Sequence, residues 1–279
     1  MFNAGGRVVK NVAGFDLVRL LVGSKGTLAL LTEVTMRLFP LPEMDQTLTV
    51  RGGSLEELAD AAVRAAAHTV TPAAVELLER FSPRESRREA VLAVRLLGGK
   101  DRVAAEAEML RVALAGAGEI TTLGPAATTF WNEVRDLEEG TDLALRLSSA
   151  PARLGELIGL AREVGRMRDG HDGLSLAPVR IAAHAGSGAL RLAVPNLRLD
   201  SGWDERWAER LDDLRHTISW RGGTFTVSRA PAALLDQLRD TGEPTVQGEL
   251  TAGLKAVFDP AGVLSVDRFL LGVGPGARG

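Results

Sequence analysis

Residues 5–17 read Gly-Gly-Arg-Val-Val-Lys-Asn-Val-Ala-Gly-Phe-Asp-Leu, and residues 23–35 read Gly-Ser-Lys-Gly-Thr-Leu-Ala-Leu-Leu-Thr-Glu-Val-Thr. The two runs carry five glycines, at positions 5, 6, 14, 23 and 26. Because glycine has no side chain, such a stretch lets the backbone come close either to another chain segment or to a phosphate group of a ligand. The residues by themselves leave both a structural turn and a cofactor cradle open, since short glycine motifs are common.

The residues between and after these runs predict a helix and a strand. Asp16 suits a helix N-cap, leucines follow on one face, and Gly23 suits the position just after the helix. From Val34 to Leu38 apolar and polar residues alternate, which predicts a strand, and Pro40 ends it.

The composition is that of an ordinary globular protein. The chain has 279 residues, a formal net charge of −3 and no cysteine. The absence of cysteine excludes a disulfide framework, a thiolate zinc site, an Fe–S cluster held by this chain and a cysteine nucleophile. With 4% aromatic residues and no basic run, nucleic acid is not an expected partner. We find no apolar stretch long enough to span a membrane and no secretory signal, so we expect a cytoplasmic protein.

The middle of the chain shows the strand–helix–strand–strand–helix–strand pattern of a ferredoxin-like layer twice in succession. The first round has expected strands at 47–50, 74–78, 90–97 and 119–122 and helices at 54–67 and 100–115. The second has expected strands at 143–148, 176–183, 189–195 and 224–228 and helices at 152–166 and 203–218. On the last helix, one face carries Trp203, Trp207, Leu211 and Leu214. We expect this face to pack in the core, and a partner-facing or flavin-facing surface is the alternative. Arg162, Arg166 and Arg168 near the end of the preceding helix are expected to face solvent.

The quoted runs resemble the second half of the flavin-binding domain of FAD-linked oxidases of the vanillyl-alcohol-oxidase and p-cresol-methylhydroxylase (PCMH) type, most nearly the FAD-binding subunit of bacterial glycolate oxidase. The segment Leu-Lys-Ala-Val-Phe-Asp-Pro-Ala-Gly-Val-Leu at 254–264 resembles the closing segment of these oxidases. The resemblance implies an α+β fold: the C-terminal lobe of a PCMH-type FAD-binding domain plus a ferredoxin-like α+β cap domain. The domains it implies are 1–43, the partial second lobe; 44–228, the cap; and 229–279, a C-terminal helical segment that returns to the FAD domain.

The resemblance also implies FAD as the cofactor. Carried over by position, the residues near the flavin edge are Lys10, Asn11, Gly14 and Asp16. Those that place backbone against the ribityl-adenosine part are Gly23, Gly26, Thr27 and Leu30. Lys25 and Ala29 depart from the residues usual in this turn, as does the stretch 265–268 after the closing segment. The family's preceding lobe, with its pyrophosphate loop, has no counterpart here, so we expect it either upstream in a longer protein or on another chain.

His184 is the candidate catalytic residue. In related 2-hydroxy-acid dehydrogenases the pattern His-x-Gly-Asp-Gly-Asn-x-His supplies two metal-binding histidines near the flavin. This chain keeps His184 and both glycines but has Ser187 for the aspartate and Arg191 for the second histidine. One imidazole beside a guanidinium does not hold a divalent ion, so we predict no metal. A flavin-facing role for His184 and a purely structural turn role both remain open.

The leading hypothesis is the FAD-binding subunit of a glycolate oxidase-like complex that oxidises a 2-hydroxy acid to a 2-oxo acid by hydride transfer to flavin. The partners implied are a catalytic flavin subunit and an Fe–S subunit. Binding to these partners would place a cytoplasmic chain at the periphery of the inner membrane. Electrons leaving the flavin would reach a quinone, oxygen or that cysteine-bearing subunit. The alternatives are a non-catalytic assembly subunit, or a fragment that no longer binds FAD without the rest of its domain. A free-standing ligand-binding module is a third reading.

Overall fold

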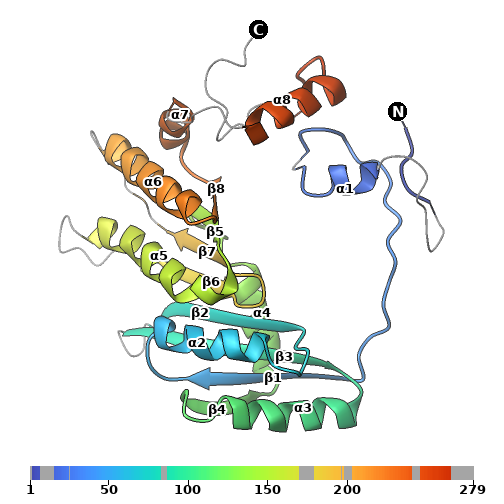
Figure 1. Ribbon diagram of the computed structural model, residues 1–279, viewed down its shortest axis with the longest axis vertical. Helices are drawn as coiled ribbons and strands as arrows, with labels where there is room; N and C mark the ends of the chain where they lie inside the picture. Colours follow the sequence, from blue (N-terminus) through green and yellow to red (C-terminus); the bar gives the residue numbers. More distant parts are fainter. Residues whose placement is uncertain are drawn as a thin grey trace. The chain divides into compact units, whose positions relative to one another are not determined.

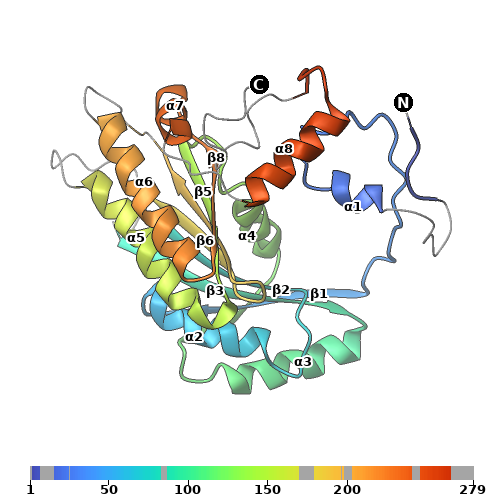
Figure 2. The same cartoon turned by 45° about the horizontal axis from the view of Figure 1, so that its top comes forward.

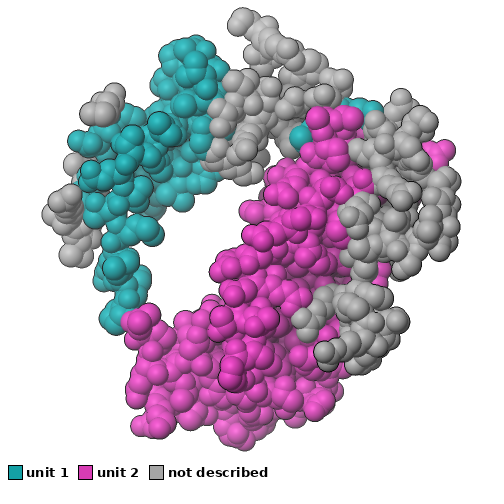
Figure 3. Space-filling model, turned by 180° about the vertical axis from the view of Figure 1, so that it is seen from behind, with its two compact units in different colours: residues 1–40, 235–279 teal, residues 41–234 magenta. Residues whose placement is uncertain are grey.

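The structure, a computed structural model, describes residues 2–6, 16–24, 26–82, 87–169, 179–195, 197, 203–240 and 246–264. The chain divides into two compact units, which Figure 3 colours separately. Unit 1 consists of residues 1–40 and 235–279, and unit 2 of residues 41–234.

Unit 2 is built on one eight-stranded antiparallel sheet (Figure 1), in the order β4-β1-β3-β2-β6-β7-β5-β8. The strands of its first half are β1 (Met44–Arg51), β2 (Ala74–Ser82), β3 (Arg87–Gly98) and β4 (Glu119–Leu123). Those of its second half are β5 (Leu143–Ser148), β6 (Arg180–His184), β7 (Ala189–Val194) and β8 (Thr224–Arg229).

Each half of the sheet has the ferredoxin-like strand order. Numbered within its own half, the first half reads 4-1-3-2 and the second reads 2-3-1-4, so the two second strands meet in the middle. These are β2 and β6, which pair antiparallel with Leu78 opposite Ala182. The predicted α+β fold with a duplicated ferredoxin-like layer is therefore confirmed, and it gives one continuous sheet.

Four helices pack on one face of this sheet (Figure 1). They are α2 (Leu55–Ala66), α3 (Lys100–Ala113), α5 (Leu154–Asp169, preceded by a 3-10 turn at Pro151–Arg153) and α6 (Trp203–Trp220). A capping box opens α2, the helix predicted over 54–67: the Glu57 N–H donates to Ser54 Oγ at 3.2 Å, and the Ser54 N–H donates to Glu57 Oε2 at 2.7 Å. Alternate strand residues such as Leu48, Leu77 and Leu92 are fully buried, because one face of every strand turns toward these helices.

The opposite face is covered in part by α4 (Ala126–Arg135), which the sequence reading did not predict (Figure 2). Phe130, Val134 and Leu137 recur at the spacing of one helical face and form a core cluster with the sheet. The sheet residues of that cluster are Leu78, Val91, Ala93, Ala182 and Ala193. The apolar spacing was the sequence signal for this helix. The helix was not predicted because its start, Gly124-Pro125, lacks a side-chain cap.

Two expectations about the helices had different outcomes. Trp207, Leu211 and Leu214 of α6 are buried as predicted, while the side chain of Trp203 lies outside the described residues. The expectation that Arg162 faces solvent is wrong. Its guanidinium pairs with Glu79 of β2 and, at 2.8 Å, with Glu56 of α2, because Glu79 is buried and needs a cation. Arg166 and Arg168 have side chains outside the described part.

Unit 1 has little regular structure beyond its helices. These are α1 (Leu17–Leu21), α8 (Val246–Phe258) and most of α7 (Ala232–Asp240). The strand predicted around Val34 to Leu38 is wrong: residues 29–42 are irregular, and their apolar side chains are exposed. A strand needs a hydrogen-bonding neighbour, and no described strand pairs with this segment. None of the described helices is long and apolar enough to cross a membrane.

Candidate functional site

The glycine-rich stretch of unit 1 forms a capped helix followed by a tight turn. Asp16 caps α1, because its Oδ1 accepts the Arg19 N–H at 3.2 Å. Val22 ends the helix, and Gly23 follows with a φ of +82°, as predicted for a residue in the left-handed region. Lys10, Asn11 and Gly14 lie outside the described residues.

The turn after α1 is held by its own hydrogen bonds. The Thr27 hydroxyl donates to the Ser24 carbonyl at 2.6 Å and the Thr27 N–H donates to the same oxygen at 3.0 Å. Thr27 is buried, and Gly26 takes a φ of +74°. A Cβ added at Gly23 would meet no atom within 4 Å. The turn is therefore internally rigid and open on its outer side at Gly23, which leaves room for a bulky group to approach the backbone.

The C-terminal motif is bonded directly to this turn. Lys255 on α8 donates from Nζ to the Thr27 carbonyl at 2.8 Å, across a sequence separation of 228 residues. The same ammonium pairs with Asp259 and donates to the Leu264 carbonyl. Asp259 in turn accepts the N–H groups of Val263 at 3.1 Å and Leu264 at 2.8 Å. The two segments that carry the resemblance thus form one hydrogen-bonded cluster.

Asp259 is held in its charged form by this cluster. The hydrogen bond from Lys255, followed by the backbone N–H donors, keeps the pKa of the carboxyl below its ordinary value. Leu30, the last of the predicted cofactor contacts, lies beyond the turn with 80% of its side chain exposed. The structure therefore brings Gly23, Gly26 and Thr27 together and leaves Leu30 on the following irregular segment.

In unit 2, His184 ends β6 and shapes the hairpin to β7. The Ser187 N–H donates to His184 Nδ1 at 3.2 Å, and the Ser187 hydroxyl lies 2.9 Å from the same nitrogen. Since a backbone N–H can only donate, Nδ1 is an acceptor, and a neutral ring carries its proton on Nε2. Gly188 takes a φ of +66°, and a Cβ there would lie 2.0 Å from the Ser149 carbonyl oxygen. Both the imidazole and this glycine are thus part of the turn.

A partly buried carboxyl lies next to His184 on the same face of the sheet. Glu76 of β2 is directly opposite His184 in the register, so their Cβ atoms are about 5 Å apart. Burial raises the pKa of Glu76 to about 7, and the charge of Arg191 offsets part of that rise. Sequence reasoning missed Glu76, because a lone glutamate in an apolar strand carries no motif.

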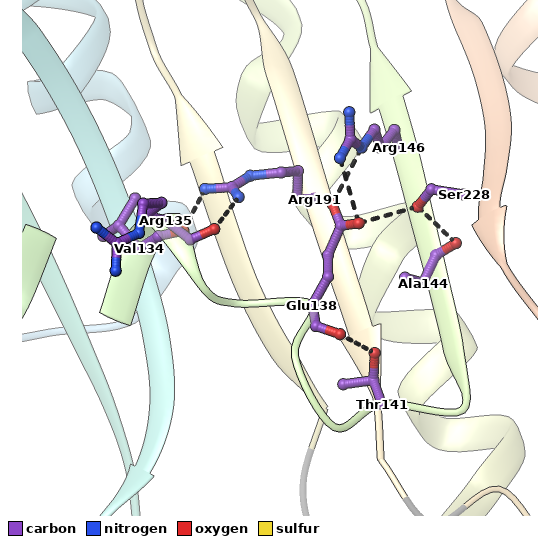
Figure 4. A network of polar contacts seen from close by, with 8 residues as sticks. All are labelled: Val134, Arg135, Glu138, Thr141, Ala144, Arg146, Arg191 and Ser228. Carbon is purple, nitrogen blue, oxygen red and sulfur yellow. Dashed lines mark hydrogen bonds and ion pairs between the residues drawn. The ribbon is translucent and has the colours of Figure 1, made fainter. Parts of the chain in front are cut away.

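Arg191 occupies the position at which the resemblance has a second histidine. In the structure its guanidinium donates to the carbonyls of Val134 and, at 3.3 Å, Arg135 (Figure 4). These are the last carbonyls of α4, where a cation complements the helix dipole. Arg191 therefore fastens α4 to the sheet.

Figure 4 also shows a network around Glu138, just beyond α4. Arg146 of β5 donates to both carboxylate oxygens, at 3.0 and 3.3 Å, and the Ser228 hydroxyl donates to Oε2 at 3.3 Å. Thr141 closes the loop by donating to the Glu138 carbonyl at 2.7 Å. Among the described residues, no three His, Asp or Glu side chains are grouped to hold a metal ion. The prediction that the protein binds no metal stays a prediction.

Comparison with known proteins agrees with the resemblance. No family model matches the chain. The glycolate oxidase subunit GlcD of Bacillus subtilis is 38% identical over 80 residues, which is 29% of this chain and 17% of that protein. The glycolate oxidase subunit GlcE of Escherichia coli is 36% identical over 132 residues, or 47% of this chain and 31% of that protein. A D-lactate dehydrogenase of Archaeoglobus fulgidus is 38% identical over 80 residues, which is 29% of this chain and 18% of that protein.

Among solved structures, an alkyldihydroxyacetonephosphate synthase matches with a TM-score of 0.56 at 13% identity. The match covers 93% of this chain and 51% of that one. The chain thus spans about half of this structural neighbour and less than a third of these curated relatives. The fold is that of the PCMH-type FAD-linked oxidases, and the predicted resemblance is confirmed. The chain is similar to the glycolate oxidase subunits GlcD and GlcE, and this similarity supports FAD as the predicted cofactor.

Proposed function

We propose that this chain is part of the FAD-binding subunit of a glycolate oxidase-like complex that oxidises a 2-hydroxy acid to a 2-oxo acid. The observation that carries the proposal is the bond from Lys255 to the Thr27 carbonyl. It joins the two segments that resemble the oxidases into one cluster, although more than two hundred residues separate them. We assign the FAD role to residues 1–43 and 229–279 and the cap role to residues 44–228.

The residues present fit a flavin nucleotide at the turn after α1. Gly23 and Gly26 have positive φ values, and the outer side of Gly23 is open. We assign Gly23, Gly26, Thr27 and Leu30 to backbone contacts with the ribityl-adenosine part, as the resemblance implies. Thr27 would contribute backbone only, since its hydroxyl is bonded to Ser24. Lys10, Asn11, Gly14 and Asp16 are assigned to the flavin edge.

When bound, FAD supplies the hydride acceptor for oxidation of the 2-hydroxy acid. The role we assign to His184 follows from its hydrogen bonds. Because Nδ1 accepts the Ser187 N–H, the neutral ring offers a donor at Nε2 and not a base. His184 would therefore orient a substrate oxygen by donating to it. Removal of the hydroxyl proton would then need another group.

Reconstitution with FAD tests the proposal. The purified full chain is incubated with FAD, freed of excess cofactor and examined for the near-ultraviolet and blue absorption bands of bound flavin. We expect bound flavin, and we expect Lys255→Met to lose it, because that substitution frees the Thr27 carbonyl. Lys100→Met on α3 is the matched control and should retain it. A chain that folds yet stays colourless would contradict FAD binding by this polypeptide.

A second candidate is a non-catalytic assembly subunit that lies beside a catalytic flavin subunit and an Fe–S subunit. The exposed apolar side chains of residues 29–42, which no described strand covers, favour it. This chain has no cysteine, so an Fe–S cluster in such a complex would be held elsewhere. Co-purification with a flavin-bearing partner, while this chain itself carries no flavin, would support the second candidate. A cytoplasmic location goes with either proposal.

A further inference from the structure

A cavity of about 670 Å³ lies within unit 2, between α4 and strands β1, β2 and β3. Its volume is in the range of pockets that bind small molecules. The floor is formed by the sheet and one wall by α4. The lining residues used below are Asp45, Glu76, Arg95, Trp131 and Arg135.

The cations that line this cavity already have carboxylate partners. Arg95 donates from Nε to Asp45 Oδ1 at 3.0 Å and from a second nitrogen to Oδ2, a bidentate pair. The same guanidinium lies 5.4 Å from the ring centroid of Trp131. Arg135 pairs in the same bidentate way with Asp136, at 2.6 and 2.7 Å. Each lining guanidinium therefore already has its charge matched by a carboxylate.

The indole of Trp131 is fixed in place as well. Its Nε1–H donates to the Thr47 hydroxyl at 2.9 Å, and its ring meets Phe130 edge to face with centroids 5.2 Å apart. Because these two contacts fix the ring of Trp131 and its Nε1–H already has an acceptor, the ring can serve as a rigid apolar wall of the cavity.

Glu76 is the exception among the charged lining residues. Its carboxyl makes no hydrogen bond or ion pair with any residue that the structure describes. The charged or titratable groups around it are Asp45 on β1, Arg95 on β3, His184 on β6, Arg191 on β7 and Arg135 on α4. Arg95 and Arg135 are engaged with aspartates, and Arg191 directs its donors at the carbonyls of α4. A carboxyl that is partly withdrawn from water and has no protein donor retains unfilled acceptor capacity.

We propose that this cavity binds a small organic amine, whose ammonium group pairs with Glu76 while its apolar part lies against Trp131. A cation supplies the donors that Glu76 lacks, whereas an anion would meet an unpaired carboxylate and guanidinium groups that are already engaged. The ring and the neighbouring alanines suit a hydrocarbon portion of several carbons. The proposal involves only unit 2 and does not depend on flavin binding.

Calorimetric titration of the full chain with three probes of matched size and different charge tests this site. The probes are phenethylammonium, 2-phenylethanol and phenylacetate. We expect the amine to bind about tenfold more tightly than the alcohol, a ratio that corresponds to about 1.4 kcal/mol of binding free energy. We expect no binding of phenylacetate. Because the ammonium pairs with the ionised carboxyl, its affinity should rise as the pH rises through about 7, where Glu76 deprotonates.

Glu76→Gln should abolish both the preference for the amine and the pH dependence. Glu119→Gln, which removes an exposed carboxylate on β4, is the control and should change neither. If Glu76→Gln fails to fold, the pH dependence in the unmodified chain decides the question. Absence of amine binding, equal binding of the alcohol, tighter binding of phenylacetate, or unchanged amine affinity in Glu76→Gln would each overturn the proposal.

Discussion

Two glutamates on one strand show how strongly the surroundings of a residue decide its role. Glu76 and Glu79 are three positions apart on β2, so they point to opposite faces of the sheet. Glu79 has a side chain that is only 2% exposed, and it pairs with Arg162 and, at 3.2 Å, with Arg88. Glu76 has no such partner among the described residues. Nothing in the local sequence separates the two, since each is a single charge in an apolar strand.

We expect the substitutions Glu79→Gln and Glu76→Gln to change stability in opposite directions. Loss of a buried charge that holds two guanidinium groups should cost about 3 kcal/mol of unfolding free energy. The raised pKa of Glu76 means that the folded state resists its ionisation, so its carboxyl destabilises the fold as the pH rises from 4.5 to about 7. Glu76→Gln should therefore stabilise at pH 8, by up to about 2–3 kcal/mol, and have little effect at pH 4. Urea denaturation at both pH values measures the unfolding free energy of each variant. Destabilisation of Glu76→Gln at pH 8 would contradict the prediction.

At the scale of elements, the link between the turn and α8 depends on Asp259. The carboxylate orients Lys255 toward Thr27 and also accepts the two N–H groups that end the segment after α8. Its pKa lies below the ordinary value of 3.8. The stabilisation that it contributes is therefore present above that pH and is lost as the pH falls through the lower, folded-state value.

Asp259→Asn should loosen this link at neutral pH. The neutral amide keeps one acceptor oxygen but loses the ion pair with Lys255, so the amides of Val263 and Leu264 should lose protection against hydrogen exchange. In the unmodified chain their protection should persist down to about pH 4 and fall in more acidic solution. Asp213→Asn on the exposed face of α6 is the control. Equal protection in Asp259→Asn and the unmodified chain would show that the carboxylate does not hold the segment.

The elements that the sequence predicted well are those whose stabilising contacts are local or repeat along the chain. The helix α2 begins at a capping box, and Gly23 follows α1 as a C′ residue. The strand prediction near Val34 was wrong because alternating apolar residues indicate only an apolar face. A strand also needs a neighbouring strand for its backbone hydrogen bonds. Contacts between distant residues, such as Lys255 with Thr27 or Arg191 with the end of α4, have no signal in one sequence. The turn of unit 1 was therefore predictable from the sequence, and the role of Glu76 in unit 2 was not.

At the scale of the whole molecule, the two halves of the sheet explain where the stability of the chain lies. The order 4-1-3-2 followed by 2-3-1-4 puts β3, β2, β6 and β7 in the middle, where each has a partner on both sides. Their inward side chains, such as Leu92, Val94 and Leu192, are fully buried. In unit 1, by contrast, α1 has five residues and none is buried, and the segment after its turn exposes apolar side chains.

This contrast predicts a graded pattern of hydrogen exchange in the full chain. Amides in the central strands should exchange only by global unfolding, because breaking any of these strands exposes the shared core. Amides of α1 and of residues 254–264 should exchange at lower free energies, since only a few buried contacts and the Lys255 cluster hold them. Added FAD should slow exchange around Gly23 and Thr27 without changing that of β3, because a ligand stabilises the part of the molecule that it binds. Exchange in α1 that is as slow as in β3 before any cofactor is added would contradict this picture, because it would mean that unit 1 unfolds only together with the sheet.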